Sequence, residues 1–216
     1  MRWKLPQPTM RVWLFASGVQ LLTSSLTYDD DHRLRRFAEL NWWEDGVDQE
    51  IMRELDKNCV FVDGGAAFGY YSILARRAGA TVHAFNPHPR FAAEMRENLA
   101  LNNITDGVHI HEAALGAEKG HARLEYGTGA QLGRGVPVRV TTLDELDLRR
   151  RAVVKLDIEG HALRGAPRLV AQNTTWFIAA HNNDERRAIL SILAGYKVKL
   201  LTRTPNEMLM ARPPAD

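Results

Sequence analysis

Strand-length apolar runs alternate with segments of helical period after residue 48, and this alternation constrains the fold more than any other feature of the sequence. It is typical of a mostly parallel sheet with helices on both faces. Five runs are expected to form parallel strands: residues 59–63, 81–85, 108–113, 153–157 and 176–180. Five helices are expected around them: residues 47–55, 71–77, 89–101, 163–171 and 185–194.

The last two apolar runs, residues 196–201 and 208–211, narrow the choice among such sheets. Only six residues, TRTPNE, separate them. Because this is too short for a crossover helix, the two strands must run antiparallel. A late antiparallel pair differs from the NAD-binding Rossmann pattern and matches the usual methyltransferase sheet. We therefore expect a class I methyltransferase (Rossmann-like) α/β fold, with a seven-stranded, mostly parallel sheet and a C-terminal antiparallel hairpin.

The segment between residues 116 and 139 interrupts the alternation. It is rich in glycine and holds short alternating stretches, HARLEY and VPVRV. This pattern predicts a β-hairpin and then an edge strand. The 216 residues suit one α/β domain with a short extension.

Charge and cysteine content bound the class of protein. The formal net charge is +2, from 28 basic and 26 acidic residues, so a nucleic-acid partner is not indicated. Cys59 is the only cysteine, which excludes a disulfide framework and fits a reducing compartment. The apolar residues 10–22 are too few to span a bilayer and precede no cleavage site. We expect a cytoplasmic protein without a membrane span.

A turn of small residues follows the first expected strand, in the stretch VFVDGGAAFGYYS. Glycine lets the backbone approach a ligand, because it has no Cβ and permits positive φ. A dinucleotide needs G-x-G-x-x-G, whereas S-adenosylmethionine, with its ammonium, carboxylate and sulfonium, is better matched by an acid followed by alternating small residues. A tight turn that binds nothing is the alternative. The predicted cofactor loop comprises Asp63, Gly65, Ala66, Ala67, Phe68 and Gly69.

The next two strand ends extend the predicted cofactor site. Asn86 and Pro87 follow the second strand, where a side chain normally contacts the ribose hydroxyls. Most nucleotide sites place a carboxylate there, whereas Asn86 donates and accepts hydrogen bonds without a charge. Glu112 and Ala113 end the third strand, where an acceptor beside a small residue can hold the adenine amino group. A surface carboxylate is the alternative for Glu112.

Seven short motifs run in the order of a known family: VFVDGGAAFGYYS, VHAFNPHP, ENLALNNI, HEAALG, VRVTTLDEL, VKLDIEGHAL and GYKVKLL with NEMLM. On these motifs, residues 48–211 resemble the FkbM family of S-adenosylmethionine-dependent methyltransferases. The resemblance implies a class I methyltransferase fold and, commonly, O-methylation of hydroxyls on sugars or secondary metabolites. We accordingly expect residues 47–216 to form the S-adenosylmethionine-binding domain and residues 1–46 an extension that packs on it.

Several positions depart from the family's pattern, among them Ser72, which stands where threonine is usual. Ala67 stands where asparagine is usual, and Asn86 replaces the glutamate of F-E-P. A closing E-L-H has become Ala179-Ala180-His181, which keeps the histidine and loses the glutamate. The D-x-E-G motif is intact.

Methyl transfer to a hydroxyl requires the acceptor to be held in line and its proton to be removed. Asp157 and Glu159 follow the fourth strand, and His181 follows the fifth. The carboxyl ends of adjacent parallel strands meet at the edge where such sheets bind ligands. We predict His181 as the general base, with Asp157 and Glu159 orienting the cofactor's ammonium, the acceptor or the imidazole.

Two other functions stay open. One is an RNA or protein methyltransferase of the same fold, and the other is a non-catalytic cofactor-binding or scaffold protein. No metal is expected, because the remaining histidines show no ligand spacing. The expected partner is a small-molecule acceptor with a sugar or metabolite hydroxyl, and the oligomeric state is left open, with a homodimer as one option.

Overall fold

The computed structural model describes residues 10–24, 46–124, 135–158, 160–172, 174–202 and 207–214. Its centre is a seven-stranded sheet with the order β11-β12-β10-β9-β3-β4-β5. β12 runs antiparallel to both of its neighbours, and the remaining pairs are parallel. The strands are β3 (Val60–Gly64), β4 (Thr81–Phe85), β5 (Val108–His111), β9 (Ala152–Leu156), β10 (Thr174–Ala180), β11 (Lys197–Thr202) and β12 (Glu207–Arg212).

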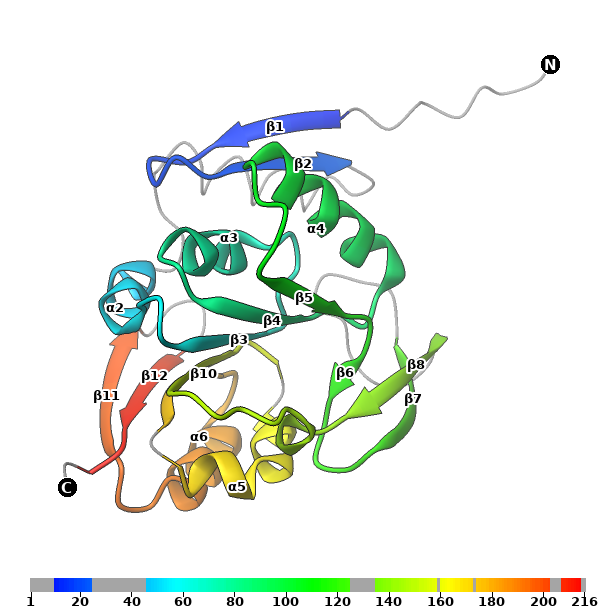
Figure 1. Ribbon diagram of the computed structural model, residues 1–216. Coiled ribbons are helices and arrows are strands. Elements are labelled where there is room, and N and C mark those ends of the chain that lie inside the picture. The colour runs from blue at the N-terminus through cyan, green and yellow to red at the C-terminus, as the bar shows by residue number, and fades with distance from the viewer. Residues whose placement is uncertain are drawn as a thin grey trace.

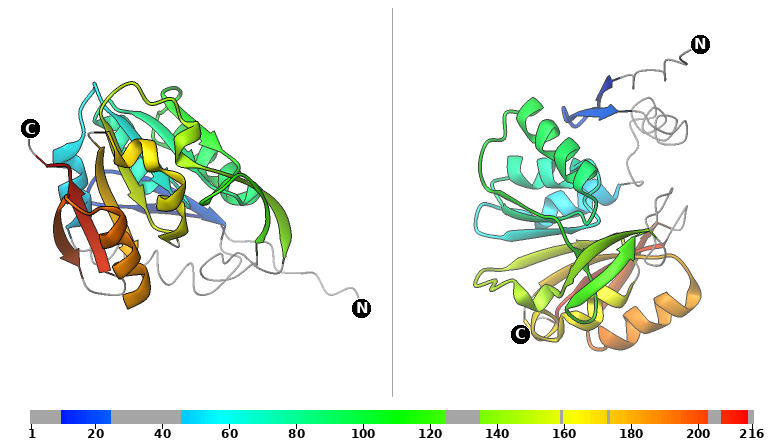
Figure 2. Two further views of the ribbon diagram at one scale, coloured as in Figure 1. Left: turned by 90° about the horizontal axis from the view of Figure 1, so that it is seen from below. Right: turned by 90° about the vertical axis from the view of Figure 1, so that its right-hand side faces the viewer.

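Helices cover both faces of this sheet, as the right-hand view of Figure 2 shows. One face carries α2 (Val47–Glu54), α3 (Tyr70–Arg77) and α4 (Pro89–Leu101), and the other carries α5 (Pro167–Val170) and α6 (Asn183–Ile192) (Figure 1). Every residue of β3, β9 and β10 is buried, which explains why these strands read as unbroken apolar runs. The predicted fold class is confirmed.

Two predicted elements are divided differently. The segment after β5 forms β6 (Ala114–Leu115), β7 (Gly120–Leu124) and β8 (Val136–Thr141), a separate sheet with β8 in the middle. The hairpin is confirmed, but the edge-strand prediction is wrong. Val138 packs with Ala114 and Leu124 into a small core of its own, which makes β8 the centre of that sheet.

The predicted helix over residues 163–171 is also divided. A 3-10 turn, η2 (Gly160–Gly165), precedes α5, and another, η1 (Leu143–Glu145), precedes β9. Pro167 stands at the first position of α5 and has no N–H to continue an earlier helix, so the helix begins anew there.

An N-terminal hairpin, β1 (Met10–Leu14) with β2 (Gln20–Ser24), lies over α4 in Figure 1. Its Phe15, Val19 and Leu21 are buried in the same core as α3 and β4. Two asparagines of α4 complete the contact: the backbone N–H of Leu22 donates to Asn98, and that of Gln20 donates to Asn102.

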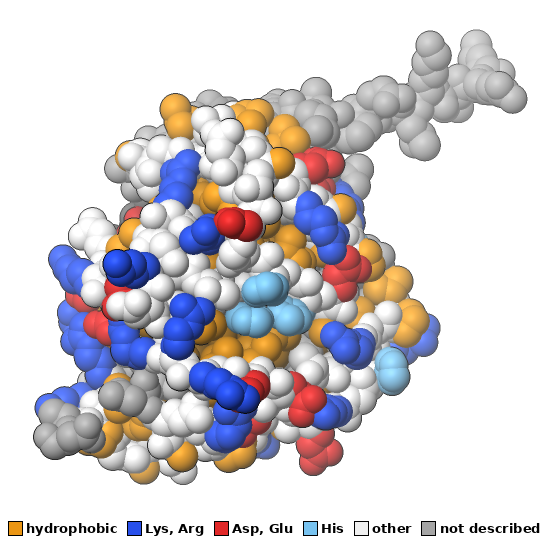
Figure 3. Space-filling view, in the orientation of Figure 1, with side chains coloured by type: hydrophobic (Ala, Val, Ile, Leu, Met, Phe, Trp, Pro, Cys, Tyr) orange, Lys and Arg blue, Asp and Glu red, His pale blue; other side chains and the backbone are white. Residues whose placement is uncertain are grey.

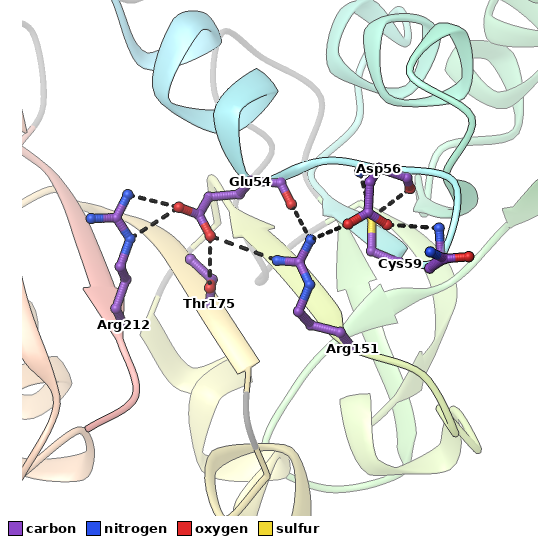
Figure 4. A network of polar contacts seen from close by, with 7 residues as sticks. Glu54, Asp56, Cys59, Arg151, Thr175 and Arg212 are labelled. Atoms are coloured by element: carbon purple, nitrogen blue, oxygen red, sulfur yellow. Dashed lines mark hydrogen bonds and ion pairs between the residues drawn. The ribbon is translucent and has the colours of Figure 1, made fainter. Parts of the chain in front are cut away.

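An ion-pair network around Glu54, the last residue of α2, holds the amino ends of β9 and β10 and the carboxyl end of the antiparallel β12 (Figure 4). Its carboxylate accepts two hydrogen bonds from Arg212 and one from Thr175. Arg151 donates to the backbone oxygen of Glu54 and to Asp56. These contacts attach α2 to β9, β10 and β12 at the edge opposite the predicted site.

None of the helices in the described ranges has the length and apolar character needed to cross a bilayer.

Candidate functional site

A glycine loop, residues 65–69, joins β3 to α3 at the carboxyl edge of the sheet. Gly65 and Gly69 have φ values of 86° and 89°, which favour glycine. A Cβ on Gly65 would lie 2.7 Å from the carbonyl oxygen of Asp157, and one on Gly69 would lie 2.9 Å from Met95 Cγ. The loop therefore turns tightly between α4 and the end of β9.

Ala67, in the middle of this loop, also has a positive φ, 46°. Its carbonyl oxygen accepts a 2.9 Å hydrogen bond from Asn86 Nδ2. The Asn86 side chain is buried, and its Oδ1 accepts a 3.3 Å hydrogen bond from the backbone N–H of His88. Asn86, the residue predicted to contact the ribose, thus stabilises the glycine loop through its side-chain amide.

Asp63, the residue that leads the predicted cofactor motif, is 1% exposed. Its Oδ2 accepts a 2.6 Å hydrogen bond from Ser72 Oγ, while its buried Oδ1 accepts none from the described residues. Burial raises the pKa of this carboxyl above its ordinary value, and the positive charge of Lys155 opposes the rise. A buried oxygen without a donor fits a positively charged donor such as the ammonium of S-adenosylmethionine.

The predicted Asp157 and His181 do come together. Asp157 Oδ1 lies 3.7 Å from His181 Nε2, and Asp157 Oδ2 lies 3.6 Å from Lys155 Nζ. The Lys155 side chain is buried and stacks its ammonium 4.8 Å from the centre of the Tyr71 ring. Glu159 lies outside the described residues.

Sequence reasoning missed Glu185 of α6. Its Oε2 accepts a 2.9 Å hydrogen bond from the backbone N–H of His181 and lies 3.2 Å from His181 Nδ1. Asn182 and Glu185 cap the helix reciprocally, because Asn182 Oδ1 accepts from the Glu185 N–H and Asn182 Nδ2 donates to Glu185 Oε1. The spacing N-x-x-E directly after His181 was the available signal.

The other predicted cofactor residues differ in their exposure and contacts. Phe68 packs edge-to-face on Phe91 at 5.5 Å, and its carbonyl accepts a 3.0 Å hydrogen bond from Asn98. Glu112 is exposed and pairs with Arg96 at 2.7 Å. Ala66 and Ala113 are buried, and Pro87 is half-buried.

Three histidines form a group on β4 and β5, seen in pale blue near the middle of Figure 3. His83 stacks on His109 and His111 with ring centres 4.9 and 5.2 Å apart, and its Nδ1 lies 3.0 Å from His111 Nε2. Burial, and then the charges of His111 and His109, lower the pKa of His83 to about 4. In the parts of the chain described above, no group of three His, Cys, Asp or Glu side chains is arranged to hold a metal ion.

The strand order defines the class I methyltransferase fold, and the glycine loop and Asp157 lie at the edge of the sheet where this class binds its cofactor. The profile of the "Methyltransferase FkbM domain" matches residues 63–198, more than half of the chain. The protein therefore belongs to the FkbM methyltransferase family and is an S-adenosylmethionine-dependent methyltransferase. A search among curated proteins gives no match.

Solved structures with the same fold include enzymes with different acceptors. An rRNA methylase from Streptococcus thermophilus is 14% identical with a TM-score of 0.54, over 78% of this chain and 94% of that one. An S-adenosylmethionine-dependent O-methyltransferase from Thermotoga maritima is 9% identical with a TM-score of 0.54, and the match covers 98% of this chain and 95% of that one. A precorrin-6y methyltransferase from Geobacter metallireducens is 16% identical with a TM-score of 0.51, and the match covers 77% of this chain and 86% of that one. At these identities the likeness shows the fold alone.

Proposed function

We propose that the enzyme methylates a hydroxyl of a sugar or small metabolite, with His181 as the general base. The observation that carries this proposal is the position of His181 at the end of β10, 3.7 Å from Asp157 at the end of β9. The main chain of Asp157 in turn contacts the glycine loop at Gly65. A base, a carboxylate and a candidate cofactor loop thus lie side by side at one edge of the sheet.

In this proposal the glycine loop, with Asp63 at its start, holds the methionine end of the cofactor. Asn86 and Pro87 flank the ribose, and Glu112 and Ala113 flank the adenine. S-adenosylmethionine supplies an electrophilic methyl group on its sulfonium, so that the protein has only to align the acceptor and remove its proton.

The protein's own part in the chemistry is proton removal and orientation. His181 accepts the hydroxyl proton at Nε2, and its side chain is 34% exposed, which gives an acceptor access. Asp157 lies between His181 and Lys155, so in this proposal its carboxylate orients the acceptor or the cofactor's ammonium beside the imidazole. Glu159 is assigned to the acceptor or to the cofactor's ammonium.

A transfer assay with S-adenosylmethionine labelled in the methyl group tests this proposal. Pools of monosaccharides, glycosides and small hydroxylated metabolites would be offered, with total RNA and a protein lysate as parallel pools. We expect label in a sugar or metabolite pool and its loss with His181→Ala. Label in RNA or protein alone would instead support a macromolecular acceptor.

A further inference from the structure

Among the residues that the structure describes, Glu185 makes the shortest side-chain contact with the His181 imidazole. Glu185 Oε2 lies 3.2 Å from Nδ1 and also accepts the backbone N–H of the same histidine at 2.9 Å. Asp157 Oδ1, on the other side of the ring, is 3.7 Å from Nε2, beyond hydrogen-bond range. The distances therefore select Glu185 as the hydrogen-bond partner of the ring.

This contact fixes the direction of the bond. An ionised carboxylate only accepts, so Nδ1 must carry the proton that it donates to Glu185. Nε2 then keeps its lone pair on the side of Asp157 and the glycine loop. The second oxygen of Asp157 is already turned to Lys155, 3.6 Å away, so Glu185 is the nearer of the two described carboxylates that face the histidine.

The Glu185 side chain is itself held in place. It is 21% exposed, and its Oε1 accepts a 3.1 Å hydrogen bond from Asn182 Nδ2. Asn182 in turn caps the Glu185 N–H at 2.9 Å. A carboxylate fixed at both oxygens loses little further entropy when it orients the ring.

We infer that Glu185 is the positioning residue of the active site, which holds His181 in the tautomer with the proton on Nδ1 and the base lone pair on Nε2. This inference rests on the proposed function. It also accounts for a sequence departure, because Ala179 stands where the family's closing motif has its glutamate. Glu185 supplies a carboxylate to the histidine from the following helix instead.

The imidazole nitrogens of the full-length protein report the tautomer directly. Proton–nitrogen correlation spectra at pH 8, with His181 assigned from a His181→Gln spectrum, should show Nδ1 protonated and Nε2 bare in the wild-type protein. Glu185→Ala should move the proton to Nε2 in most molecules, while Glu185→Gln, which keeps an acceptor oxygen, should retain the wild-type form. A wild-type protein with the proton on Nε2, or an unchanged tautomer in Glu185→Ala, overturns the inference.

Two neighbouring variants are matched controls. Asp184→Asn removes a carboxylate from the same helical turn, where it pairs only with Arg187 among the described residues. Asn182→Ser keeps a helix-capping hydroxyl but drops the donor to Glu185. Both should keep the wild-type tautomer. A swap in Asp184→Asn would assign the effect to surface charge, and a swap in Asn182→Ser would assign it to the hydrogen bond that Asn182 donates to Glu185.

Activity adds an independent readout once an acceptor has been found in the transfer assay. Glu185→Ala should lower kcat by about tenfold to hundredfold, part of the roughly 10²–10⁴ that a general base supplies, with the KM for S-adenosylmethionine unchanged. An unchanged kcat would overturn the positioning role. If His181→Ala retains full turnover, the proposed base is wrong, whereas the tautomer result still stands on the spectra.

Discussion

The side-chain amide of Asn86 donates a 2.9 Å hydrogen bond to the carbonyl oxygen of Ala67. Both residues depart from the family's pattern, and the structure brings the two departures into contact. An ionised glutamate at position 86 could not donate this bond. The two positions are therefore coupled through the Ala67 backbone, because a neutral amide supports a loop whose central alanine has a positive φ.

Replacing Asn86 with aspartate tests this coupling. The variant loses the donor and buries a carboxylate against the Ala67 carbonyl, so we expect the free energy of unfolding to fall by about 1–3 kcal/mol. Urea titration at pH 7 measures the change. Asn103→Asp is the control, since Asn103 is exposed and also has a positive φ, and it should change stability little. Equal stabilities of Asn86→Asp and wild type would contradict the account.

The positive φ of Ala67 leads to a second prediction, in which a substitution raises the stability of the protein. A left-handed conformation costs an alanine roughly 1–2 kcal/mol, and asparagine tolerates it better. Ala67 is exposed, so a longer side chain meets no packed neighbour. Ala67→Asn should raise the thermal midpoint. The control is Ala93→Gly, at an exposed position inside α4, which should lower the thermal midpoint. A lower midpoint for Ala67→Asn would show that the loop is unstrained.

The histidine group predicts a pH dependence of stability. The pKa of His83 is about 4 in the folded protein, against an ordinary value of 6.5, because the ring is buried beside His109 and His111. Between these two values the unfolded chain binds more protons than the folded protein, so stability falls as the pH falls from 6.5 towards 4. Burial, and then the charges of His109 and Arg139, also lower the pKa of His111, which adds to this trend.

Urea unfolding at several pH values measures this effect. His83→Gln should flatten the decline between pH 6.5 and 4, because one group with a lowered pKa is removed. His121→Gln, on the exposed part of β7, is the control and should keep the wild-type slope. Parallel curves for His83→Gln and wild type would rule out this source of acid sensitivity.

Asn98 connects the N-terminal hairpin to the glycine loop. Its Oδ1 accepts from the Leu22 N–H, and its Nδ2 donates to the Phe68 carbonyl at 3.0 Å. Asn98→Ala should therefore lower stability by about 1–3 kcal/mol and also weaken binding of S-adenosylhomocysteine. Asn102→Ala loosens the same hairpin without touching the loop, so calorimetry should find its affinity unchanged. Equal affinities of the two variants would disprove the connection.

The sheet could be predicted from the sequence because parallel strands buried on both faces read as unbroken apolar runs. Since strand ends meet at one edge, Asp157 and His181 could be placed together as well. The contact between Asn86 and Ala67 could not be foreseen, because it joins positions nineteen residues apart through a backbone oxygen that no pattern records. The packing of the hairpin around Val19 was equally hidden, because it is held by side chains distant in the sequence, Asn98 of α4 and Asn102 directly after it.

Titration calorimetry with S-adenosylhomocysteine tests the central claim most directly. The wild-type protein should give saturable binding at one site well below millimolar ligand. Gly65→Val should abolish that binding, because a Cβ at this position would lie 2.7 Å from the Asp157 carbonyl oxygen and would displace the loop; circular dichroism checks that the variant is still folded. Absence of heat from the wild-type protein at millimolar ligand, or equal binding by Gly65→Val, would contradict the assignment of the glycine loop as the cofactor site.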